Sequence, residues 1–152
     1  MIIVERTDPH HPQATALLKQ SHALMESLFP PEDNFYLDID DLVADDIHFF
    51  TAREGDQILG TAALKVKTDY GEIKSMFVDE AARGKGVADA LMRQLEDQAR
   101  EDGLPILKLE TGNVLHAAHK LYRRHGFTDC GVFGDYVEAN SNINMEKQHR
   151  FR

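Results

Sequence analysis

The chain of 152 residues is long enough to bury a sizeable hydrophobic core, and we expect one domain over residues 1–152. Its 17 basic and 26 acidic residues give a net charge of −9, which argues against broad nucleic-acid binding, because phosphate backbones attract a basic face. A hydrophobic content of 42%, no apolar run of membrane-spanning length and a single cysteine, Cys130, together favour a soluble cytoplasmic protein that does not associate with membranes.

The N-terminal third predicts a strand, a helix and an irregular acidic stretch. Residues 2–6 are expected to form the strand, and apolar residues then recur at helical spacing over 14–28. Two prolines at 30–31 end this helix. The stretch 32–46 is acidic and irregular, with a short helix indicated near 39–43. Its carboxylates could attract an amine, although a solvated charged loop is the simpler interpretation of each one.

The middle of the chain predicts three strands, a helix and a fourth strand. Residues 47–53, 57–67 and 70–78 have the composition of strands joined by tight turns. A helix over about 86–102 and a buried strand over 106–110 follow. Because a single helix connects the strands 70–78 and 106–110, these two strands should run parallel.

The last part of the chain predicts one more helix, over 113–125, and a closing antiparallel pair of strands, over 127–133 and 143–147. The loop 134–142 between these strands is long enough to reach an active site. The order of elements predicts an α/β (α+β) fold in which helices flank a mixed sheet. That sheet should be antiparallel at its edges and parallel at one internal pair.

The glycine-rich segment before the second long helix carries the first chemical signal. Gly84 and Gly86 leave the backbone open to close approach by a ligand, and Arg83 and Lys85 add positive charge. The helix that begins here offers unpaired N–H groups and the positive end of its dipole, which suit a phosphate. The segment therefore predicts a phosphate site, with a solvated turn as the plainer alternative.

Two common phosphate loops fit this segment poorly. A Walker-type loop requires Ser or Thr after the Gly84-Lys85 pair, where this chain has Gly86. A dinucleotide-binding fingerprint requires a third small residue where this chain has Asp89. A nucleotide-binding protein of either type is therefore disfavoured.

A second segment, residues 117–127, has Leu-Tyr within a short helix and ends in Gly126-Phe127. Gly126 suits the left-handed conformation that ends a helix, and Phe127 can restart a strand. Together with the glycine-rich segment 83–88, it resembles the motifs of the Gcn5-related N-acetyltransferase (GNAT) superfamily. The order of elements over 48–147 also resembles that family, and the resemblance does not name an acceptor.

The resemblance implies a GNAT fold, in which the parallel strand pair splays apart and the pantetheine arm of acetyl-CoA lies in the gap. It assigns this cosubstrate to Met76, Phe77 and Val78 for the arm, and to Arg83, Gly84, Lys85, Gly86, Val87 and Ala88 for the pyrophosphate. Asn113, just after the second splayed strand, matches a further position that binds the arm. Asn113 could equally be the N-cap of the helix that follows.

The resemblance also implies two catalytic groups. Tyr122 matches the family's general acid near the sulfur of CoA, since a phenol with a pKa of about 10 can donate a proton at neutral pH. The alternative for Tyr122 is a core tyrosine. Glu72 lies where some members place a base, and its alternative is a surface acid paired with Lys74. In an alternating strand Glu72, Lys74 and Met76 would share one face.

The remaining candidates concern the acceptor and metals. We expect Asp135 and Tyr136, in the long loop, to face the acceptor substrate. No metal is expected, because His116 and His119 could share a helix face but no cysteine cluster or HExxH pattern accompanies them. Cys130 is expected to be a buried thiol rather than a nucleophile.

These interpretations together predict an N-acetyltransferase that moves the acetyl group of acetyl-CoA directly to a primary amine of a small molecule, peptide or protein. The alternative is an acyl-CoA-binding regulatory or interaction module without turnover. A homodimer is a further expectation, since dimers are common in the family. The acceptor and the use of other acyl groups stay open.

Overall fold

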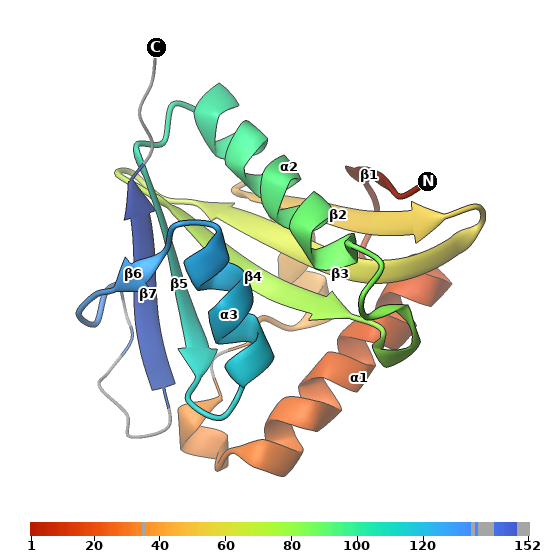
Figure 1. Ribbon diagram of the computed structural model, residues 1–152, viewed down its shortest axis with the longest axis horizontal. Helices are drawn as coiled ribbons and strands as arrows, with labels where there is room; N and C mark the ends of the chain where they lie inside the picture. The colour runs from red at the N-terminus through yellow and green to blue at the C-terminus, as the bar shows by residue number, and fades with distance from the viewer. Residues whose placement is uncertain (35, 135, 137–141, 149–152) are drawn as a thin grey trace.

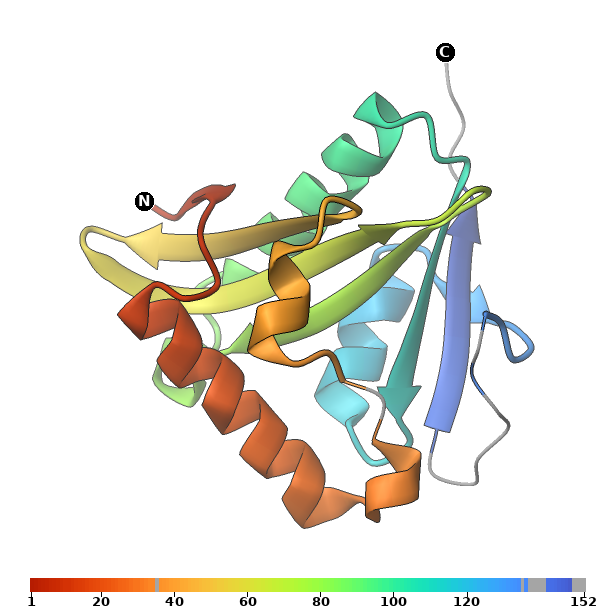
Figure 2. The same cartoon turned by 180° about the vertical axis from the view of Figure 1, so that it is seen from behind.

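The computed structural model describes residues 1–34, 36–134, 136 and 142–148. Within them, seven strands form one sheet in the order β1-β2-β3-β4-β5-β7-β6 (Figure 1; Figure 2 from behind). The strands are β1 (Ile3–Arg6), β2 (Ile47–Glu54), β3 (Gln57–Val66), β4 (Gly71–Val78), β5 (Ile106–Gly112), β6 (Thr128–Asp129) and β7 (Asn142–Gln148). The helices are α1 (Pro12–Leu28), α2 (Val87–Glu101) and α3 (His116–Arg124), with short 3₁₀ helices η1 (Pro31–Asp33), η2 (Ile39–Val43) and η3 (Glu80–Ala82). No helix in this part of the chain is long and apolar enough to cross a membrane.

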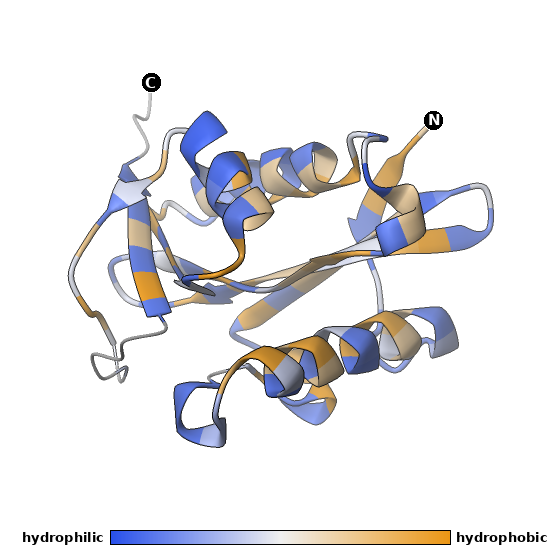
Figure 3. Cartoon of the chain, turned by 60° about the horizontal axis from the view of Figure 1, so that its bottom comes forward, coloured by the Kyte–Doolittle hydropathy of each residue, from blue (hydrophilic) through white to orange (hydrophobic). Residues whose placement is uncertain are grey.

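The sheet is the middle of three layers, and each face buries the apolar side of a helix. Helix α1 covers one face (Figure 3), and there Leu18 packs in a cluster with Phe49 and Ala63. Helices α2 and α3 cover the opposite face, where Leu91 and Leu95 of α2 are fully buried, four residues apart on one side of the helix. Side chains along each strand therefore alternate between two separate cores.

The pairing of β4 with β5 is parallel and covers only part of each strand. The partners are Gly71 with Leu107, Glu72 with Lys108 and Ile73 with Leu109. Beyond these pairs the two strands diverge, as the arrows of β4 and β5 show in Figure 1. The splayed parallel pair expected from the sequence is thus present, and its open end lies at the carboxyl ends of both strands.

A β-bulge in β4 lies at the point where the strands diverge. Ser75 has a φ of +54°, the only positive φ of a non-glycine residue in the described chain. The register with β3 shifts here, so that Ser75 and Met76 together oppose Ala62. The hydroxyl of Thr61, on β3, donates a 2.8 Å hydrogen bond to the carbonyl oxygen of Ser75. This contact holds the bulged backbone in place.

The bulge corrects one expectation about β4. Glu72 and Lys74 do share a face, since the Lys74 Nζ lies 3.4 Å from a Glu72 carboxylate oxygen. Met76 does not follow them, because the extra residue in the bulge turns it toward the core under α2, where it packs with Ile73. Strict alternation therefore fails after Lys74.

The expected mixed sheet is confirmed, but two elements near the C-terminus differ from the prediction. Helix α3 begins at His116 instead of residue 113, since a turn closed by the Leu115 N–H and the Gly112 carbonyl comes first. The N-cap is Leu115, so Asn113 does not cap this helix. Strand β6 has two residues instead of seven, and β7 lies between it and β5. The chain leaves the sheet after β6, and Phe133 packs edge-on against Tyr70.

We predict that Thr61→Val will lower the free energy of unfolding by about 1 kcal/mol, because it removes the donor to a part-buried carbonyl while keeping the shape of the side chain. Urea unfolding monitored by circular dichroism measures this change. Thr68→Val is the matched control at an exposed turn position and should stay within about 0.5 kcal/mol of wild type. Equal midpoints for the two variants would show that the bulge does not depend on this bond.

Candidate active site

The loop between β4 and α2 presents open backbone at the start of the helix. Gly84 has a φ of +84° and Gly86, the N-cap of α2, has a φ of +81°. A Cβ atom added to either glycine would meet no atom within 4 Å, so both face open space. The first N–H groups of α2 have no partner inside the helix and point toward this space. The geometry is that of an anion site at a helix N-terminus.

The charges around this loop favour an anion in spite of the acidic first turn of α2. Asp89 lies in that turn, but Arg124 and His125 each donate a 2.8 Å hydrogen bond to its carboxylate. The bond from Arg124 contributes most, and together with the bond from His125 it holds the pKa of Asp89 below its usual range. Lys85 adds a cation on the loop itself, 3.6 Å from Glu54.

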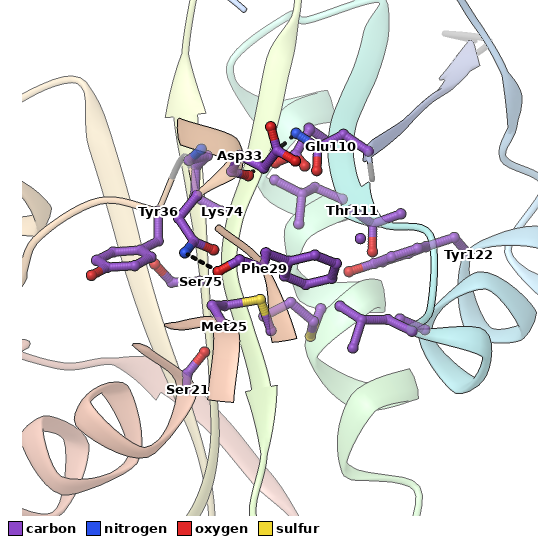
Figure 4. A pocket seen from close by; sticks show the side chains of 17 residues that line it. Ser21, Met25, Phe29, Asp33, Tyr36, Lys74, Ser75, Glu110, Thr111 and Tyr122 are labelled. Carbon is purple, nitrogen blue, oxygen red and sulfur yellow. Dashed lines mark hydrogen bonds between the residues drawn. The ribbon is translucent and has the colours of Figure 1, made fainter. Parts of the chain in front are cut away.

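A cavity of about 130 Å³ occupies the open end between β4 and β5 (Figure 4). We call it the transfer cavity; its lining includes Met25, Phe29, Tyr36, Lys74, Ser75, Glu110, Thr111, Gly112 and Tyr122. Phe29, just after α1, packs so closely on β5 that a Cβ atom at Gly112 would lie 2.1 Å from its ring. Glycine is therefore required at this position, and the end of α1 closes one side of the cavity.

Tyr122 reaches the transfer cavity from α3. Only 6% of the residue is exposed, and its hydroxyl points toward the cavity and the Phe29 ring (Figure 4). Burial raises the pKa of Tyr122 well above its usual value, and the nearby charge of Glu110 raises it further. The phenol therefore keeps its proton at neutral pH.

Glu110, on β5, faces the same cavity and was not recognised from the sequence. Burial raises its pKa to about 7, and the charges of Glu72 and Asp33 add to this effect while Lys74 opposes it. A carboxyl group with this pKa exchanges protons readily near neutral pH. The available sequence signal is an acid at the carboxyl end of a largely apolar strand, where ligand-binding residues of parallel strands gather.

Glu72, Lys74 and Tyr136 form a buried polar network beside the transfer cavity. The Tyr136 hydroxyl donates to the Glu72 carboxylate and accepts from the Lys74 ammonium. Glu72 is 4% exposed and Lys74 is 9% exposed, so the ion pair between them is buried instead of lying on the surface. Burial, with the charge of Glu72, raises the pKa of Tyr136. Tyr136 thus joins Glu72, while Asp135 lies outside the described residues.

The other candidate residues take different positions. Asn113 is exposed in the turn after β5. The His119 Nε2 donates a 2.8 Å hydrogen bond to the Gly112 carbonyl, and the His119 ring packs edge-on against the ring of His116. The described residues contain no group of three His, Cys, Asp or Glu placed to hold a metal. Cys130 is half-buried just beyond β6 instead of fully buried within a strand.

Comparison with known proteins agrees with this geometry. Residues 14–127 match the model of the Acetyltransferase (GNAT) family. The chain is 36% identical over 148 residues to IAA acetyltransferase from Azospirillum brasilense, covering 96% of this chain and 97% of that protein. It is 35% identical over 139 residues to the uncharacterised N-acetyltransferase YsnE from Bacillus subtilis, covering 90% of this chain and 92% of that protein.

Two solved structures share the fold along nearly the whole chain. A structure from Klebsiella pneumoniae, provisionally described as an acyl-CoA N-acyltransferase, has a TM-score of 0.82 and 27% identity and covers 97% of each chain. PaiA N-acetyltransferase from Thermoplasma acidophilum, in complex with coenzyme A, has a TM-score of 0.75 and 14% identity. That likeness covers 98% of this chain and 99% of the Thermoplasma chain.

We predict that Gly86→Val will weaken CoA binding at least tenfold, about 1.4 kcal/mol, because the branched side chain projects into the open space before α2. Isothermal titration calorimetry measures the affinity. The positive φ at this position also strains valine, so a control with the same backbone penalty is needed.

Gly103 provides that control at the other end of α2. It has a φ of +71° and, like Gly86, no atom within 4 Å of an added Cβ. Gly103→Val should destabilise the fold to a similar degree and leave CoA affinity unchanged. Equal CoA affinities for Gly86→Val and Gly103→Val would remove the loop from the site.

Proposed function

Because this chain belongs to the acetyltransferase (GNAT) family, we propose that it transfers the acetyl group directly to a primary amine held at the open end of β4 and β5. The chain is an acetyl-CoA-dependent N-acetyltransferase, as its family and its named relatives establish. The observation that carries the proposed site is the transfer cavity, which Glu110 and Tyr122 enter from two different elements. The name of the Azospirillum relative makes IAA one compound to include in an acceptor screen.

Residues on both sides of the splay fit a bound acetyl-CoA. The amide groups at Gly84 and Gly86 and the first turn of α2 suit its pyrophosphate, since both glycines face open space. The backbone of 76–78 lies beyond the last pair with β5, so this edge of β4 is available to the amides of the pantetheine arm. When bound, acetyl-CoA supplies the acetyl thioester, and the chain orients it toward the transfer cavity.

Tyr122 is the group that we propose to stabilise the departing sulfur. Its raised pKa keeps the phenol protonated, whereas a thiol has a pKa of only about 8.5. At equilibrium this phenol therefore retains its proton and donates a hydrogen bond to the negative charge that develops on sulfur. Its burial in the cavity wall excludes water from that bond.

Glu110 is the group that we propose to accept the proton of the amine. An ordinary glutamate, with a pKa of about 4.3, is a weak base toward an alkylammonium group with a pKa of about 10.4. A pKa of about 7 makes Glu110 a stronger base while leaving much of it ionised at neutral pH. Glu72, the base predicted from the sequence, is already engaged by Lys74 and Tyr136, so we propose a positioning role for it.

Three further expectations stay predictions. A homodimer is tested by light scattering after size-exclusion chromatography, and a cytoplasmic location by fractionation of the cells that produce the protein. A mechanism without a metal predicts the same rate before and after treatment with a chelator.

We predict that Tyr122→Phe will reduce turnover by roughly 10²-fold, because the ring packing is kept and one donor to the developing charge is lost. Acetyl-CoA binding should change little, since the bond forms only as the sulfur departs. A thiol-release assay measures the rate, and it also separates an enzyme from a binding module without turnover. Tyr70→Phe, outside the lining of the cavity, is the matched control; an equal loss in both variants would contradict the role of Tyr122.

We predict that Glu110→Gln will lower kcat/KM at pH 7 by roughly 10²-fold and remove the inflection near pH 7. The wild-type rate should rise through that pH because the carboxylate form of Glu110 becomes populated. Raising the pH should partly restore the variant, since more of the amine is then neutral. Glu72→Gln is the matched comparison and should retain the inflection. If Glu72→Gln alone loses it, the base is Glu72.

Unfolding measurements give a second readout that does not depend on turnover. The pKa of Glu110 is raised from 4.5 to about 7, so this group stabilises the fold fully below pH 4.5 and the contribution is lost as the pH rises through 7. Glu110→Gln should therefore gain stability relative to wild type between about pH 5 and pH 8. Glu72→Gln should be less stable than wild type at both values, because Lys74 loses its buried partner.

A further inference from the structure

A second cavity, of about 220 Å³, adjoins the transfer cavity and has a basic lining. We call it the lysine cavity; its lining residues are Tyr36, Leu37, Lys65, Lys67, Glu72, Lys74, Gly134 and Tyr136. Tyr36 and Lys74 line both cavities, so the two spaces share a wall. Three lysines and one glutamate make this lining positive, in a chain whose net charge is −9.

Two of these lysines have no ion-pair partner among the described residues. The charge of Lys74 is compensated within the buried network by Glu72. By contrast, the ammonium groups of Lys65 and Lys67 make no hydrogen bond or ion pair with any part of the chain that the structure describes, although both residues are half-buried. Lys65 lies opposite Glu72 in the register of β3 with β4, but the Glu72 carboxylate is engaged by Lys74 and Tyr136. Lys65 lies next to the last residue of β3 and Lys67 directly follows the strand, two residues on, so both side chains line the same cavity.

The other two half-buried lysines of the described chain are paired. Lys108 and Lys147 each lie within 4 Å of a glutamate oxygen, at 3.8 Å from Glu146 and 2.6 Å from Glu96. Acidic residues outnumber basic ones by 26 to 17, so carboxylates are plentiful. Two cations with no carboxylate in ion-pair contact, in a cavity that partly excludes water, attract an anion more strongly than exposed lysines do.

We propose that the lysine cavity binds a carboxylate of the acceptor, so that the acceptors are amino acids and other short amines that carry a carboxylate. This inference rests on the proposed function, since it takes the amine to be oriented toward Glu110 in the transfer cavity. The acceptor then spans the shared wall at Lys74 and Tyr36, with its carboxylate toward Lys65 and Lys67. The acidic stretch 32–46, whose carboxylates could attract the amine, is not required for this orientation.

The test compares acceptors that differ only in the carboxylate. Alanine, leucine, phenylalanine and glutamine are each assayed beside the corresponding α-amide by thiol release from acetyl-CoA. Wild type should prefer the best amino acid over its amide at least tenfold in kcat/KM, mainly through a lower KM. The α-amine of an amino-acid amide is less basic than the α-amine of the amino acid itself, so more of it is neutral near pH 7. This difference alone would favour the amide, against the expected preference for the amino acid.

The double variant Lys65→Gln/Lys67→Gln should reduce this preference at least tenfold, and Lys65→Glu/Lys67→Glu should reverse it. Lys19→Gln, an exposed lysine on the outer side of α1, should keep the wild-type preference. An amide that is used as well as its amino acid, or a preference unchanged in the double variant, would overturn the proposal.

Failure of the proposed function would give a different result. No thiol release with any amine, or with IAA, would reject the proposed transfer site. Calorimetric binding of each amino acid and amide to the CoA-saturated protein still tests the lysine cavity in that case. Tighter binding of the acid form, lost in Lys65→Gln/Lys67→Gln, would support the cavity, and equal binding of both forms would reject it.

Discussion

The divergence of β4 from β5 is the constraint on which the rest of the structure depends. Parallel pairing stops at Ile73 and Leu109, and the carboxyl ends of both strands then border an open space. The bulge at Ser75 lies at this point, and its positive φ is a conformation of the kind that persists only when surrounding contacts enforce it. The bond from Thr61 supplies such a contact. The transfer cavity, the free edge of β4 and the position of Glu110 all follow from this divergence.

The charges around the transfer cavity work as a coupled set. Lys74 and Glu72 act on Glu110 in opposite directions, so burial remains the main cause of its raised pKa. The same ion pair is held by Tyr136, which reaches it from the far end of the chain. An ion pair that is buried and fully engaged makes a fixed electrostatic environment, because none of its members can reorient without leaving a buried polar group unpaired. The tuning of Glu110 therefore depends on residues that do not themselves need to react.

The two segments that resemble GNAT motifs are also joined directly. Asp89 in the first turn of α2 accepts hydrogen bonds from Arg124 and His125 at the end of α3. Tyr122 lies two residues before Arg124 on that helix. The loop that suits a pyrophosphate and the helix that carries the phenol are thus held in a fixed relation, and binding at one end of the site is geometrically linked to the chemistry at the other.

Local pattern in the sequence determined most of the elements and the phosphate loop. Helical spacing identifies α1 and α2, the single-helix connection identifies β4 and β5 as parallel, and the two glycines before α2 mark the open backbone. Each of these signals lies within a few residues or in the order of elements. Only the tertiary structure decided the bulge at Ser75, the place of β7 between β5 and β6, the role available to Glu110 and the lysine cavity. Those features depend on burial and on neighbours far away in the chain, which set the charge and the accessibility of a side chain without leaving a periodic pattern.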